Sequence, residues 1–213
     1  RQDDAQAVQW YRKAAEQGDD SAQNNLGMMY ANGQGVRQDD AQAVQWFRKA
    51  AEQGNAQAQL NLGVMYYKGR GVRQDDAQAE LWTRKAAEQG SANAQNNLGA
   101  MYAQGLGVRQ DYAQAVQWYR KVAEQGDAEA QYNLGVMYYN GQGVRQDYTQ
   151  AVQWYRKAAE QGDAEAQYNL GLMYYKGEGV RQDLALAQEW FGKACQNGNQ
   201  NGCDNYQRLK AGY

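Results

Sequence analysis

The sequence predicts an all-α fold in which helical hairpins stack into a right-handed superhelical solenoid with 36-residue repeats. Three observations predict it. The tripeptide Arg-Gln-Asp recurs every 36 residues from Arg1 to Arg181 without a slip. Within each period, apolar residues follow the spacing of two amphipathic helices. Glycines and good N-cap residues mark the ends of both segments. Repeats of this length, each a helix pair, bury their apolar faces by stacking on their neighbours.

The first helical segment of each period carries its own start and stop signals. In the second period Asp39 precedes the segment and Gln42 follows three residues later, which is a capping-box pattern. Ala43 and Phe47 then lie on one face, at i and i+4. The segment ends at Gly54, which suits the left-handed position after a helix, so the turn that follows is very short.

The second segment begins directly after that turn and contains a glycine of its own. Asn55 is a good N-cap residue, and Leu62 lies on the apolar face of the segment. Gly63 follows Leu62 in mid-helix, where glycine costs roughly 1 kcal/mol relative to alanine. Its recurrence in every full copy leads us to expect two helix backbones too close to admit a Cβ. The Gly-x-Gly-Val turn at 69–72 closes the period, because its glycines allow positive φ.

Composition excludes several classes of function. The 213 residues carry a formal net charge of −2, which gives no attraction for nucleic acid, and no apolar run is long enough to insert into a membrane. The absence of histidine removes imidazole-dependent triads and most catalytic zinc sites. The Gly-x-Gly turns follow helices instead of strands, which argues against a nucleotide site. We therefore expect no metal ion and no cofactor.

The repeat resembles a known family. Residues 128–135, Ala-Glu-Ala-Gln-Tyr-Asn-Leu-Gly, are similar to the first helix of a tetratricopeptide repeat, and residues 151–159 to its second. The lengthened glycine turn and the 36-residue period resemble the Sel1-like repeats. The resemblance implies one array over 1–213, and we expect natural sequence to continue upstream of Arg1. Its expected parts are an orphan helix at 4–17, hairpins at 19–53, 55–89, 91–125, 127–161 and 163–197, and a polar capping helix at 200–210.

Both cysteines fall in the last period. Cys195 and Cys203 occupy sites equivalent to Ala51 and Gln59, which face each other across the tight turn, and this favours a disulfide. The alternative is two independent substitutions in a reduced cytoplasmic protein. Their spacing resembles the bridged hairpins of the secreted, cysteine-rich bacterial Sel1-like proteins, which implies a periplasmic or secreted location. Two thiols without histidine do not make a zinc site.

We expect no catalytic residue, because the recurrent carboxylates, such as Asp39 and Glu52, repeat with the scaffold whereas catalytic groups need a unique environment. The resemblance implies a monomeric scaffold or adaptor that binds a peptide or protein in a concave groove. The alternatives are a structural spacer or self-association module and, less favoured, a hydrolase. Carrying over the tetratricopeptide pattern places ten binding residues on the first helices of the hairpins. They are Tyr67, Lys68, Tyr132, Val136, Tyr139, Asn140, Tyr168, Leu172, Tyr175 and Lys176.

Aromatic residues at these positions distinguish the fourth and fifth hairpins from the first and third, which present small and amide side chains. Aromatic groups with polar tips are typical of binding hot spots. The tyrosines could instead serve only to pack one hairpin on the next, and the sequence leaves that alternative open.

Overall fold

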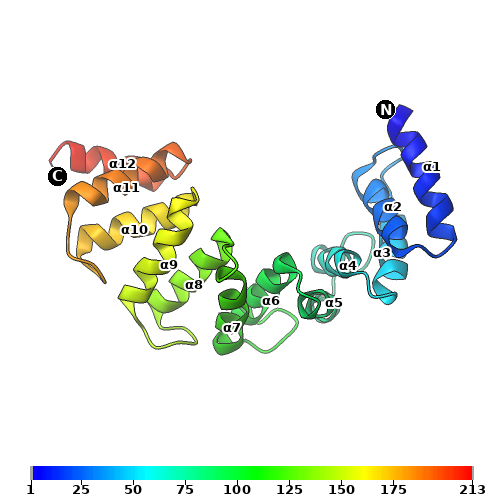
Figure 1. The fold of residues 1–213 in the computed structure, drawn as a ribbon, viewed down its shortest axis with the longest axis horizontal. Helices are drawn as coiled ribbons and strands as arrows, with labels where there is room; N and C mark the ends of the chain where they lie inside the picture. Colours follow the sequence, from blue (N-terminus) through cyan, green and yellow to red (C-terminus); the bar gives the residue numbers. More distant parts are fainter. Residues whose placement is uncertain (1, 213) are drawn as a thin grey trace. The chain divides into compact units, whose positions relative to one another are not determined.

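The computed structural model describes residues 2–212, and within this range the chain forms twelve α-helices and no strand (Figure 1). Two helices fall in each 36-residue period, so the predicted all-α repeat fold is confirmed. The backbone contacts divide the chain into two compact units, Arg1–Gln110 and Asp111–Tyr213. In each unit every helix packs against the next one in the sequence.

The first unit contains six helices: α1 (Gln2–Glu16), α2 (Asp20–Asn32), α3 (Asp40–Glu52), α4 (Ala56–Lys68), α5 (Asp76–Glu88) and α6 (Ala92–Gln104). The second unit contains the other six of the described residues: α7 (Tyr112–Ala123), α8 (Ala128–Asn140), α9 (Tyr148–Glu160), α10 (Ala164–Lys176), α11 (Leu184–Gln196) and α12 (Gln200–Lys210). The even-numbered helices α2 to α10 are the first helices of the predicted hairpins.

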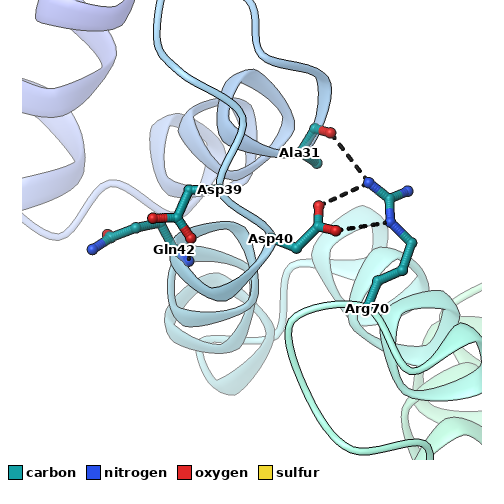
Figure 2. Close-up of polar contacts among 5 residues, drawn as sticks. All are labelled: Ala31, Asp39, Asp40, Gln42 and Arg70. Carbon is teal, nitrogen blue, oxygen red and sulfur yellow. Dashed lines mark hydrogen bonds and ion pairs between the residues drawn. The ribbon is translucent and has the colours of Figure 1, made fainter.

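The helix starts follow the local sequence. The carboxylate of Asp39 accepts a hydrogen bond from the backbone N–H of Gln42 at 3.1 Å, as the capping pattern predicts (Figure 2). Asp183 does the same for the N–H of Leu186 at 3.0 Å, although no glutamine stands at that position. The aspartate alone therefore suffices to satisfy this orphan donor.

The glycine turn after α4 is fastened to the preceding hairpin. Gly71 has a φ of +69°, and a Cβ there would collide with the backbone carbonyl of Asp40. The guanidinium of Arg70 donates to the Asp40 carboxylate at 2.8 and 3.1 Å and to the carbonyl of Ala31 at 3.2 Å (Figure 2). The turn thus links two successive repeats, and only glycine fits at the point of contact.

Buried glutamines also hold the hairpins together, which the sequence did not predict. The side-chain N–H of Gln59 donates to the carbonyl of Ala51 at 3.2 Å, and its oxygen accepts from Gln89 at 2.7 Å. Gln131 makes the same pair of bonds in the second unit, with Ala123 at 3.1 Å and Gln161 at 2.8 Å. A buried amide is stable only when its polar atoms are paired, so these bonds belong to the scaffold.

The mid-helix glycines lie chiefly against side chains, which corrects the expectation of backbone meeting backbone. A Cβ on Gly135 would lie 2.7 Å from the ring of Tyr155. Gly63 lacks such a ring, and its Cβ would lie 2.7 Å from the Thr83 hydroxyl and 3.1 Å from the carbonyl of Ala79. The glycine therefore leaves space for an aromatic ring of the next helix. We call this space over the glycine the seat, and at Gly63 no ring occupies it.

The predicted disulfide joins Cys195 near the end of α11 to Cys203 in the first turns of α12, with the two Cα atoms 4.5 Å apart. It spans the tight turn at Gly198, which has a φ of +95°. The bridge therefore fixes α12 against α11.

Candidate functional site

The predicted binding residues of the second unit occupy the same four positions in two successive repeats. Four of them lie on α8 and four on α10, each 36 residues after its counterpart. We name these eight the tyrosine surface: Tyr132, Val136, Tyr139, Asn140, Tyr168, Leu172, Tyr175 and Lys176. Tyr67 and Lys68 hold the same positions on α4 of the first unit.

Two cavities open along the tyrosine surface. The first has a volume of about 240 Å³, and the second a volume of about 290 Å³. The first is lined by Tyr132, Val136, Tyr139, Asn140, Tyr155, Asn169, Leu172 and Met173. The second is lined by Tyr168, Leu172, Tyr175, Lys176, Phe191, Asn205, Arg208 and Leu209. Because Leu172 lines both, the two cavities are adjacent and α10 forms the wall between them.

Tyr132 and Tyr168 line the cavities and also pack against the neighbouring helices. The ring of Tyr132 packs on the buried Tyr155 with centroids 5.9 Å apart, and the ring of Tyr168 packs on Phe191 at 5.7 Å. Both tyrosines are half-buried, and burial raises the pKa of Tyr132. For these two positions, packing of one helix on the next accounts for part of the aromatic pattern.

Tyr139 and Tyr175 occupy the same position in successive repeats but have different surroundings. The hydroxyl of Tyr139 donates to the Glu178 carboxylate at 3.1 Å, and its ring packs on Tyr148 with centroids 5.1 Å apart. Burial and this hydrogen bond raise the pKa of Tyr139. Tyr175 is 42% exposed. Tyr175 is therefore the more available contact residue of the pair.

The lysines of the site also differ. The Lys176 ammonium lies 3.9 Å from the Glu178 carboxylate. Lys68 has no ion pair with any described residue of the chain, and it is exposed at the end of α4. The two equivalent positions thus offer different net charge to a ligand.

A third cavity lies in the first unit; two residues of its lining, Tyr67 and Lys68, are among the predicted binding residues, but the cavity itself was not predicted. It has a volume of about 330 Å³. Its lining comes from α4, α5, α6 and the turn after α6, and consists of Gly63, Val64, Tyr67, Lys68, Ala79, Thr83, Asn97, Ala100, Met101, Gln104 and Leu106. A signal was present in the sequence, because Glu80-Leu81-Trp82-Thr83 replaces the Val-Gln-Trp-Phe of residues 44–47.

Within residues 2–212, no three histidine, cysteine, aspartate or glutamate side chains gather closely enough to hold a metal ion. No helix in the same range combines the length and the hydrophobicity needed to cross a membrane.

Comparison with known proteins decides the family. The family described as Sel1 repeat matches six successive segments, at 1–19, 20–55, 56–91, 92–127, 128–163 and 164–199. The chain belongs to the Sel1 repeat family. Sel1 repeat proteins generally act as scaffolds for protein interactions and are generally not catalytic. No curated protein matches the chain.

Solved Sel1 repeat structures share both fold and sequence with it. A protective antigen of uropathogenic Escherichia coli strains is 46% identical, with a TM-score of 0.91 over 96% of this chain and 44% of that one. The chain therefore spans less than half the length of that antigen. A Sel1 repeat protein from Oxalobacter formigenes is 41% identical, with a TM-score of 0.84 over 91% of this chain and 77% of that one.

Proposed function

We propose that this Sel1 repeat chain is a non-catalytic adaptor that binds an extended peptide or protein segment along the tyrosine surface. The observation that carries the proposal is the pair of adjacent cavities divided by Leu172, both lined by residues that the repeat pattern had selected. Each volume, about 240 and 290 Å³, suits one or two side chains of a ligand. Neighbouring cavities of this size favour a ligand that inserts successive side chains.

The chemistry of the walls supports such a ligand. Tyr132, Leu172 and Tyr175 provide rigid apolar area, which is the kind of surface that dominates typical interface energies. Asn140 and Asn205 supply amide groups at the cavity walls, where they can pair with the backbone of an extended ligand. Apolar anchors surrounded by polar groups are the usual anatomy of a protein-binding site.

We further propose a periplasmic or secreted location, supported by the disulfide in the last repeat, since such bonds persist in oxidising compartments. Mass spectrometry of protein isolated natively with its thiols blocked should recover the two cysteine peptides joined. Two freely alkylated thiols would place the protein in the cytoplasm instead.

The binding proposal is tested with a displayed library of random peptides selected against the whole chain. For a recovered peptide, Tyr175→Ala should weaken binding by about 2 kcal/mol, close to thirty-fold in Kd, because an exposed aromatic anchor is removed. Isothermal titration calorimetry measures the change, and circular dichroism checks that the helices persist.

The matched control is Trp10→Ala, which removes another exposed aromatic side chain, 70% exposed on α1 of the first unit and not part of the tyrosine surface. It should leave Kd unchanged. If no peptide is recovered, or if recovered peptides bind Tyr175→Ala and Leu172→Ala as tightly as the unmodified chain, the tyrosine surface belongs to the scaffold and the structural-spacer alternative is favoured.

A further inference from the structure

The cavity between α4, α5 and α6 exists because one ring of the scaffold is missing. In three of the described repeats an aromatic ring of the second helix lies on the mid-helix glycine: Phe47 on Gly27, Tyr155 on Gly135 and Phe191 on Gly171. In the second hairpin (55–89) Thr83 occupies that place over Gly63. A threonine is smaller than a ring, so the seat stays partly open, and Gly63 and Ala79 line the cavity of about 330 Å³.

The neighbouring helix enlarges the same space. Ala100 of α6 lines the cavity, whereas the equivalent position in other repeats carries Met28, Val64, Val136 or Leu172. Leu106, in the turn after α6, occupies the place that Glu178 holds beside Tyr139. The cavity walls are therefore mostly apolar, and Tyr67 at its edge is 44% exposed.

Two polar side chains in the cavity lining, Thr83 and Lys68, can bond to a ligand. Thr83 is only 4% exposed, and its hydroxyl oxygen is the side-chain atom nearest to Gly63 at the cavity wall. A hydroxyl can both donate and accept hydrogen bonds, so a polar ligand group that enters the cavity can bond to it. Lys68, also in the lining, has no ion pair within residues 2–212, because the nearby turn offers Arg70 where a carboxylate stands in the fifth repeat.

We propose that this cavity is a specific pocket for a tyrosine side chain of the partner, with an acidic residue beside that tyrosine. The ring would occupy the seat over Gly63 that Tyr155 and its equivalents fill elsewhere. The phenol can bond to the Thr83 hydroxyl, and the acidic group can pair with Lys68. The inference rests on the proposed function only in taking the ligand to be part of a protein.

The test uses small probes, so it does not depend on finding a peptide. The probes are p-cresol, which is the tyrosine side chain alone, and 3-(4-hydroxyphenyl)propionate, which adds a carboxylate. Titration of the whole chain, followed by NMR of labelled methyl groups, should shift the signals of Val64, Met101 and Leu106 with both probes. The carboxylate probe should bind two- to five-fold more tightly, and Lys68→Gln should abolish that advantage, since an exposed ion pair contributes modestly.

The decisive variant is Thr83→Phe, which restores the ring type found at Phe47 and Phe191 and should therefore fold. It should weaken both probes at least ten-fold. Ala100→Leu narrows the cavity from α6 and should do the same, so the proposal does not depend on one variant. Thr83→Val, which keeps the shape and removes the hydroxyl, should weaken p-cresol more than toluene.

The proposal is overturned if neither probe shifts these methyl signals, or if Thr83→Phe and Ala100→Leu bind the probes as well as the unmodified chain. These outcomes are separate from failure of the tyrosine surface. Selected peptides that depend on Tyr175 but bind Thr83→Phe normally would leave the proposed function standing and contradict the pocket.

Discussion

At the scale of single residues, the recurring glycine and the residue twenty positions later act as a pair. Where that residue is Phe47, Tyr155 or Phe191, its ring covers the glycine. Where it is Thr83, a cavity remains. Because protein interiors are close-packed, one smaller residue in this repeated pair is enough to leave space that the scaffold elsewhere fills with a ring.

Two glycine-to-alanine changes should have opposite effects on the free energy of unfolding, one at a recurring glycine covered by a ring and one at a glycine outside this pattern. Gly135→Ala places a Cβ 2.7 Å from the ring of the buried Tyr155 and should destabilise the fold by about 1 to 3 kcal/mol. Gly192→Ala, in α11, meets the ring of Tyr206 at 3.2 Å and gains helix propensity. It should be neutral or stabilising by up to about 1 kcal/mol. Urea denaturation measures both, and an equal effect at the two sites would contradict the packing described for Gly135.

At the scale of helices, α12 packs on α11 and also forms part of the tyrosine-surface cavities. Asn205, Arg208 and Leu209 of α12 line the second cavity of the tyrosine surface. The Cys195–Cys203 disulfide ties α12 to α11, so the bridge also supports one wall of that cavity. A short, polar helix of this kind needs such a tie, because isolated helices of its length are marginal in water.

Replacing both cysteines by alanine should lower the free energy of unfolding by about 2.5 kcal/mol, the loop-entropy contribution of so short a bridge. The loss should be concentrated in α12, whose amide protons should exchange faster than those of α8. Denaturation with and without reductant measures the loss, and the double variant, which has no bridge, is the control. If reductant leaves the unmodified chain as stable as before, the bridge does not hold α12.

At the scale of the whole molecule, local features could be predicted from the sequence and long-range ones could not. The Asp39 cap and the positive φ of the turn glycines depend on residues close in the chain, and the 36-residue period extends them along the array; the cysteine pair is also local but occurs only in the last period. The positions in the repeat at which the residues of the tyrosine surface lie were predicted from the resemblance to tetratricopeptide repeats.

What the sequence analysis missed depends on contacts between repeats. The hydrogen bond from Tyr139 to Glu178 joins residues 39 positions apart, and the cavity at Thr83 needs α4, α5 and α6 together. The change from Val-Gln-Trp-Phe to Glu-Leu-Trp-Thr was visible, but an isolated departure from a consensus does not reveal whether neighbours fill the space. Only the three-dimensional packing shows that they leave it open.

The central claim, that the tyrosine surface binds a protein segment, is tested most directly by hydrogen–deuterium exchange of the whole chain with and without a selected peptide. Peptide binding should add protection in the second unit on α8, α10 and α12, whose residues line the two cavities. Helices α9 and α11, which contribute only Tyr155 and Phe191 to the cavity walls, should change less. Protection confined to α9 and α11, with α8 and α10 unchanged, would contradict it.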